Sequence, residues 1–167
     1  MRHLLLLTSL VALAASTLPA QAQHAHGEGR LDVVIDKDSI AINLELPLDA
    51  AVGFERAPRN EREKAALAAT EKTLGDAALF VPMPAANCTA QPPKVVMPAF
   101  GAKAGNDGHG DIDASYVYRC ANPAALKSIE TGIFKQFKRL YRLEAQRAGP
   151  SGQGKQRLTP KNPVLAW

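Results

Sequence analysis

The sequence predicts an α+β fold: an antiparallel sheet of about five to seven strands with two main helices packed on one face and one disulfide. Several segments alternate apolar and polar residues with a period of two, as half-buried strands do, and two segments carry helix-start signals. Strands and helices do not alternate as βα units, which disfavours a doubly wound sheet. With 46% hydrophobic and 22% charged residues, the 167-residue chain suits one globular domain.

A β-hairpin is the first predicted element. Its first strand alternates from Leu31 to Ile35, a turn follows at 36–39, and the second strand alternates from Ile40 to Leu46. Pro47 ends this strand because proline has no amide hydrogen for the ladder. The same period predicts further strands at 112–120 and 141–145, and short strands are expected at 94–97, 155–158 and 164–167.

Two helices are predicted from capping signals. In the first, Asn60 caps the start, Glu63 stands three residues on as in a capping box, and Gly75 ends the helix. The second opens at Asn122, with Pro123 in the first helical position. The apolar faces are Ala66, Leu67, Thr70 and Leu74 for the first helix and Leu126, Ile129, Ile133 and Phe134 for the second.

The first 22 residues are predicted to be a secretory signal peptide. Arg2 precedes an apolar stretch at 4–15, and the small-residue tripeptide at 20–22 is a typical cleavage site. We therefore expect export to the periplasm and a single mature domain at 23–167. No later segment is apolar enough to cross a bilayer, so the mature protein is not expected to be membrane-embedded.

Cys88 and Cys120 are predicted to form a disulfide, because export brings them to an oxidising compartment and only one intramolecular pairing exists. The bond would stabilise the fold by about 3–4 kcal/mol in the chain-entropy picture. A redox-active or metal-binding pair is the alternative, but the spacing lacks the Cys-x-x-Cys pattern.

Two short segments have spacing suited to a metal ion. His24 and His26 point the same way if the segment is extended, and His109, Asp111 and Asp113 share one strand face. Imidazole and carboxylate suit zinc, although copper would compete for the same groups. The alternatives are a polar, mobile terminus and an exposed turn rich in aspartate. If the strands starting near Leu31 and Ile112 paired, the two segments could share a site.

Other activities find little support. Ser115, His109 and Asp113 could be drawn as a triad, but they lie within seven residues and no nucleophile elbow is present. Phosphate loops, dinucleotide fingerprints and His-Glu-x-x-His are missing from the sequence. The 20 basic residues only slightly exceed the 16 acidic ones and do not cluster, so no nucleic-acid partner is expected.

The chain from residue 23 onward resembles the ZrgA-like periplasmic zinc-binding proteins of Gram-negative bacteria. The order and spacing of many short pieces carry the resemblance. These are His24 to Gly27, Leu46-Pro47, Val52 to Glu55, the helix ending at Leu74, Leu79-Phe80, Cys88, His109, Asp111, Asp113 to Tyr116, Cys120, Pro123, Leu126, Phe134 and Leu165 to Trp167.

The resemblance implies an exported protein, made under zinc limitation, that binds zinc and supports uptake alongside a zinc ABC transporter or its binding protein. Carried over by position, it indicates His24, His26, His109 and Asp111 as ligands. Members often have a long His/Asp/Glu-rich tract before the strand equivalent to 112–120. Residues 100–108 hold no histidine, so one or two zinc sites are expected instead of high-capacity buffering.

We therefore expect a non-catalytic periplasmic zinc-binding protein. The main alternative is a structural or interaction protein of the cell envelope, whose histidines are incidental. A metal-dependent hydrolase with Asp113 as base is a third hypothesis.

Overall fold

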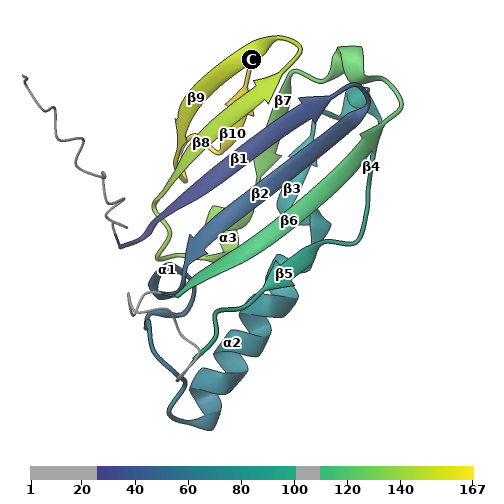
Figure 1. Cartoon of the computed structure of the whole chain (residues 1–167). Helices are drawn as coiled ribbons and strands as arrows, with labels where there is room; N and C mark the ends of the chain where they lie inside the picture. Colours follow the sequence, from purple (N-terminus) through teal and green to yellow (C-terminus); the bar gives the residue numbers. More distant parts are fainter. Residues whose placement is uncertain (1–25, 101–109) are drawn as a thin grey trace, which may run out of the picture.

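The computed structural model describes residues 26–100 and 110–167, and its main feature is a seven-stranded sheet (Figure 1). The strand order is β4-β6-β2-β1-β8-β9, and β5 also pairs with β6. The bounds are β1 (Glu28–Asp36), β2 (Ser39–Pro47), β4 (Cys88–Ala90), β5 (Lys94–Val96), β6 (Asp111–Cys120), β8 (Arg142–Gly149) and β9 (Gly152–Leu158).

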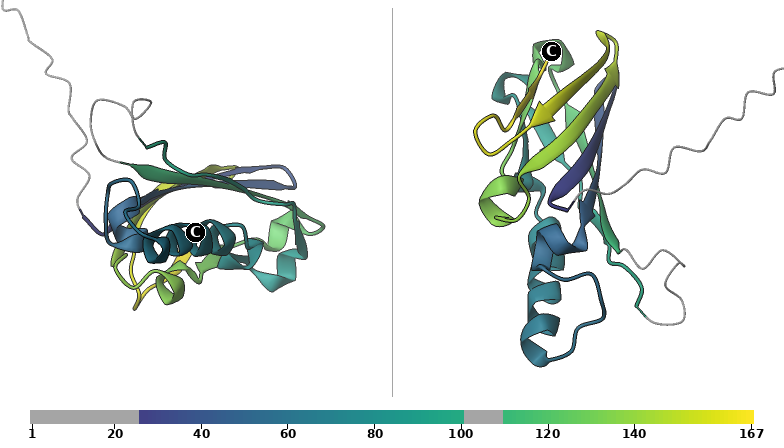
Figure 2. Two further views of the ribbon diagram at one scale, coloured as in Figure 1. Left: turned by 90° about the horizontal axis from the view of Figure 1, so that it is seen from below. Right: turned by 90° about the vertical axis from the view of Figure 1, so that its left-hand side faces the viewer.

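A smaller, three-stranded sheet forms part of a second layer (Figure 2). Its order is β10-β7-β3, with β3 at Phe80–Pro82, β7 at Ser128–Thr131 and β10 at Val164–Ala166. The helices are α1 (Leu48–Val52), α2 (Glu61–Leu74) and α3 (Ile133–Gln136), with 3-10 turns η1 (Ala77–Leu79), η2 (Pro84–Ala86) and η3 (Pro123–Ala125). Among the described residues, α2 is therefore the one helix longer than five residues.

The large sheet is mixed, which corrects the predicted antiparallel sheet. β1 pairs with β2 antiparallel but with β8 parallel, with Leu31 opposite Ala145. A parallel pair needs a long crossover, and here the chain between β1 and β8 also contributes β3 and β7 to the small sheet. Alternation along a strand shows which side chains are buried, but it does not show which edge the strand joins.

The predicted second helix is also wrong. Residues 123–136 form η3, β7 and α3 instead, and in β7 the buried Ile129 and Thr131 alternate with Ser128 and Glu130. β7 is paired on both sides, by β10 and β3, so β10 does not complete the large sheet as expected. The few apolar positions in this segment fit the period of a helix as well as that of a strand. The segment becomes a strand because β10 and β3 provide hydrogen-bond partners for the backbone of β7.

The hairpin, the first helix and the strand before Cys120 are confirmed. β1 and β2 pair from Arg30↔Glu45 to Asp36↔Ser39. α2 begins after Asn60, whose side chain accepts a hydrogen bond from the Glu63 amide at 2.9 Å. The Glu63 carboxylate does not complete the capping box on Asn60, because it binds Arg56 and the Arg59 amide.

The hydrophobic core lies between the large sheet and the second layer. Tyr116 and Tyr118 lie on the inward face of β6, are buried, and extend across the core to the second layer. Tyr116 packs edge-on against Phe80 with ring centroids 4.8 Å apart, and its hydroxyl donates to the Leu74 carbonyl at 2.8 Å. The Tyr118 hydroxyl donates to the Phe80 carbonyl at 2.9 Å. Burial raises the pKa of both tyrosines, so their hydroxyls remain protonated donors at neutral pH.

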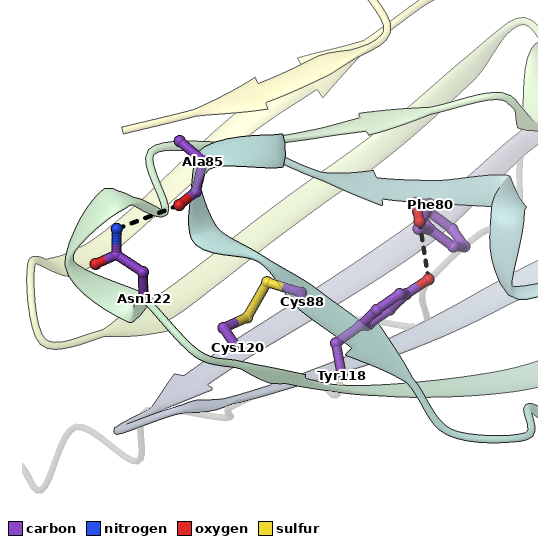
Figure 3. Close-up of a disulfide and its surroundings, with 6 residues drawn as sticks. All are labelled: Phe80, Ala85, Cys88, Tyr118, Cys120 and Asn122. Atoms are coloured by element: carbon purple, nitrogen blue, oxygen red, sulfur yellow. Dashed lines mark hydrogen bonds between the residues drawn. A yellow bond between two sulfur atoms is a disulfide. The ribbon is translucent and has the colours of Figure 1, made fainter.

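The predicted disulfide is present and joins β4 to the end of β6 (Figure 3). Cys88 and Cys120 lie opposite each other in the ladder, with an S–S distance of 2.09 Å. Beside the bond, the Asn122 side chain donates to the Ala85 carbonyl at 3.2 Å, and the Ala121 amide donates to the Asn87 carbonyl at 3.0 Å. Hydrogen bonds therefore hold the same two segments together independently of the sulfur bridge.

Candidate metal site

The start of β1, the end of β2 and the start of β6 lie at one end of the large sheet (Figure 1). β2 lies between β1 and β6 and is antiparallel to both, so the hypothesis that β1 and β6 pair directly is wrong. Their starting points nevertheless lie at the same end of the sheet, two strand spacings or about 10 Å apart. The helix α1, which follows β2 directly, lies at this end as well.

His26, Asp49 and Glu55 form a cluster at this end, here called the His26 cluster. The His26 Nδ1 atom lies 2.9 Å from Asp49 Oδ2 and 3.7 Å from Glu55 Oε1. One potential ligand atom from each residue lies within 4.8 Å of the other two. The His26 side chain is 75% exposed, whereas Asp49 and Glu55 are 20% and 24% exposed. The cluster is thus a carboxylate pair at the surface, with an accessible imidazole above it.

The two carboxylates are placed by the chain reversal after β2. Pro47 ends the strand, and Asp49 stands in the first turn of α1. Gly53 then takes a positive φ of 87°, a conformation that favours glycine, while its amide donates to the Asp49 carbonyl at 2.8 Å. This turn brings the chain back past α1, so that Glu55 reaches the same imidazole as Asp49.

The position of His26 is determined by the residues that follow it. Gly27 has a φ of 73°, and a Cβ there would lie 2.6 Å from Tyr141 Cε1 and 2.7 Å from the Arg139 carbonyl oxygen. The Gly27 carbonyl accepts a hydrogen bond from the Tyr141 amide at 3.0 Å. Only glycine allows this close approach, which holds the residue after His26 against the start of β8.

Glu28 strengthens the same attachment. Its carboxylate forms an ion pair with Arg142 and accepts a hydrogen bond from the Tyr141 hydroxyl at 3.0 Å. The hydrogen bond from Arg142 lowers the pKa of Glu28, and the hydrogen bond to Glu28 raises the pKa of Tyr141. Glu28 is therefore ionised at neutral pH and engaged with β8, so it does not belong to the donor set around His26.

Asp49 has one carboxylate oxygen without a hydrogen-bond partner. Asp49 Oδ1 is buried and unsatisfied among the described residues, whereas Oδ2 faces His26. Leaving a buried acceptor unpaired costs about 1–3 kcal/mol, and more for a charged group. Such an exception to hydrogen-bond satisfaction calls for an explanation, and a cation at the cluster would supply one.

The donor set fits zinc in chemistry and in spacing. Zinc binds imidazole nitrogen and carboxylate oxygen at about 2.0–2.2 Å, so two ligands of a tetrahedral ion lie about 3.4 Å apart. The separations of 2.9 and 3.7 Å from His26 Nδ1 bracket that value. The cluster supplies three protein ligands, and because the imidazole among them is exposed, a tetrahedral ion would have room for a fourth ligand.

The family described as "ZrgA family zinc uptake protein" matches residues 23–167. The chain belongs to the ZrgA family. A comparison with curated proteins finds no match. In the described part of this ZrgA protein, no helix is long and apolar enough to span a membrane.

The ligands predicted from the ZrgA sequence are only partly described. His24 and His109 lie outside the described residues, and His26 belongs to the cluster. Asp111 begins β6 opposite Pro47, at the same end of the sheet. Asp113 is exposed on the outer face of the sheet, opposite Glu45 and Val96. Neither aspartate is part of the His26 cluster.

Asp49 and Glu55 are the residues that the sequence reasoning missed. The predicted hairpin carried a usable signal, because the chain that leaves the second strand of a hairpin lies beside the chain that enters the first. Residues just after Pro47 therefore had to lie near residues just before β1. Histidine spacing within one segment does not show that these two segments lie together.

Proposed function

We propose that this ZrgA protein is a non-catalytic, exported zinc-binding protein that supports zinc acquisition, and that the His26 cluster binds the ion. The observation that carries the proposal is the convergence of one imidazole and two carboxylates, with an unsatisfied buried oxygen on Asp49. The zinc uptake role in the family description supports zinc as the cargo.

The exposure of the cluster supports zinc as a cargo ion that the protein binds and releases. Buried structural sites with four protein ligands retain their zinc, whereas an exposed site with three can exchange it. The His26 Nδ1 atom faces both carboxylates, which favours this nitrogen as the ligand atom. Copper would bind the same donors at least as tightly, so affinity alone does not select zinc, and site geometry and metal supply must contribute.

Export to the periplasm through a signal peptide at 1–22 remains part of the proposal. A disulfide between Cys88 and Cys120 supports an oxidising compartment. The family match beginning at residue 23 supports a domain that starts after the proposed cleavage point. Within that compartment, a zinc ABC transporter or its binding protein is the proposed partner.

Isothermal titration of the tag-free protein from residue 23 with zinc tests the proposal. We expect micromolar or tighter binding of one ion. His26→Ala and Asp49→Asn should each weaken binding by at least about tenfold, because each removes a ligand. Asp36→Asn, at the opposite end of β1, is the matched control and should bind like the wild type.

Three further variants separate the His26 cluster from the ligand set predicted from spacing. His24→Ala and His109→Ala test the proposed histidines that the structure does not describe, either of which would act as a fourth ligand. Asp113→Asn tests the predicted aspartate on the outer face of the sheet. Loss of binding in Asp113→Asn with normal binding in Asp49→Asn would refute the cluster as the site. No heat at micromolar zinc would refute zinc binding itself.

A further inference from the structure

Glu55 lies in an irregular segment, whereas Asp49 stands in α1 and His26 stands two residues before β1. Glu55 stands between α1 and α2, in a segment from Gly53 to Asn60 without regular secondary structure. A carboxylate on such a segment can adopt many positions. Fixing it in the position that binds a metal costs conformational entropy unless another contact already restricts it. The contacts of its neighbour Arg56 provide that restriction.

Arg56 is held by a two-point ion pair with Glu63. Its Nη1 atom donates to Glu63 Oε2 at 2.7 Å and its Nη2 atom donates to Glu63 Oε1 at 2.8 Å. A paired geometry of this kind fixes the direction of the guanidinium as well as its distance. Because consecutive Cα atoms are about 3.8 Å apart, fixing Arg56 limits where Glu55 can lie.

Two further contacts tighten the same segment. The Arg59 amide donates to Glu63 Oε2 at 2.7 Å, so the Glu63 carboxylate binds the segment at two points, Arg56 and Arg59. The Arg56 guanidinium also lies over the Phe54 ring, 5.0 Å from its centroid, which engages the residue before Glu55. The residues on both sides of Glu55 are therefore restrained.

Glu63 provides a firm attachment point because α2 is anchored to the core. Asn60 caps the helix beside Glu63, and at the other end Leu74 is fully buried. The Leu74 carbonyl accepts a hydrogen bond from the buried Tyr116 hydroxyl. The Glu63 side chain is itself only 19% exposed. The restraint on Glu55 thus passes through a helix attached to the central sheet.

We infer that Arg56 and Glu63 are positioning residues that hold Glu55 at the His26 cluster and thereby increase its affinity for zinc. This inference rests on the proposed zinc site and adds the residues that organise it. Neither side chain is expected to touch the ion, because each carboxylate or guanidinium is occupied by the other. Their loss should lower zinc affinity by displacing Glu55, without altering His26 or Asp49.

The experiment is a zinc titration of the protein from residue 23, in competition with a chromophoric chelator. Glu63→Gln removes the charge and one acceptor oxygen but keeps the size of the side chain and the backbone hydrogen bond to Asn60. We expect about tenfold weaker zinc binding, the usual effect of losing a group that orients a ligand. Arg56→Lys keeps the charge without the two-point geometry and should lie between wild type and Glu63→Gln.

A double-mutant cycle with Glu55 distinguishes positioning from general destabilisation. If Glu63 acts through Glu55, Glu63→Gln should have no further effect on zinc affinity in a Glu55→Gln background. Asp38→Asn is the matched control, since it breaks an ion pair at the opposite end of the sheet, where Arg119 Nη1 lies 3.0 Å from Asp38 Oδ1.

The outcomes separate this inference from the proposed function. Wild-type affinity in Glu63→Gln, or equal losses in Glu63→Gln and Asp38→Asn, would overturn the positioning role while leaving the zinc site intact. Additive losses from Glu55→Gln and Glu63→Gln would also overturn it. A wild-type protein that binds no zinc would instead refute the proposed function, and the positioning role with it.

Discussion

Removing the disulfide should destabilise the protein strongly without abolishing zinc binding. Cys88 and Cys120 are 32 positions apart, so the bond closes a loop of about 33 residues. In the chain-entropy model, a loop of that length stabilises the folded state by about 3.7 kcal/mol at 25 °C. That is a large fraction of the about 5–15 kcal/mol by which a typical domain is stable.

The perturbation is the double variant Cys88→Ala/Cys120→Ala, followed by urea unfolding monitored by far-UV circular dichroism. With a denaturant slope of about 2 kcal/mol/M, the expected loss corresponds to a midpoint lowered by about 2 M urea. The wild-type protein treated with a reducing agent should show the same shift. This comparison corrects for the two sulfur atoms that the alanine variant lacks.

Zinc affinity should change little in the same variant, because the disulfide and the His26 cluster lie at opposite ends of β6. The ten residues of that strand span about 30 Å. Hydrogen bonds from Ala121 and Asn122 to the segment before Cys88 would also remain. A midpoint shift below about 0.5 M urea would refute the loop-closure reasoning. Loss of zinc binding in the folded variant would refute the separation of the two sites.

Two further predictions concern the residues around the cluster. Gly27→Ala should weaken zinc binding and lower the thermal midpoint, because its Cβ would lie 2.6 Å from the Tyr141 ring; a variant with wild-type values would contradict this packing. The pKa of Glu63 is lowered to about 2 by the hydrogen bond from Arg56, against about 4.3 in unfolded chains. A lowered pKa adds stability above pH about 4.3 that is lost as the pH falls through about 2. The difference in thermal midpoint between wild type and Glu63→Gln should therefore persist from pH 7 to 5 and vanish near pH 2, and a difference unchanged at pH 2 would contradict it.

Local signals predicted the elements whose conformation depends on neighbours in the chain. The hairpin follows from alternation and a proline stop, and α2 follows from the Asn60 cap. The disulfide followed from composition and export, since only one pairing was possible. In contrast, the segment from 123 to 136 has apolar residues compatible with helix or strand. Pairing with β3 and β10, which are distant in sequence, makes part of it a strand.

The candidate site shows the same division. Histidine spacing singled out His26, and the family resemblance gave zinc as the expected ion. Asp49 and Glu55 are 23 and 29 positions further along the chain, so no short motif links them to His26. They reach it because β2 returns antiparallel to β1 and Gly53 then reverses the chain.

The sequence alone thus determined the alternating strands, the capped helix, the cysteine pair and the family. The tertiary structure decided the parallel pairing of β8 with β1, the second sheet and the companions of His26. The physical reason is that periodicity and capping depend on residues within about one or two turns of the chain. Strand partners and metal ligands, in contrast, depend on which distant segments the core brings together.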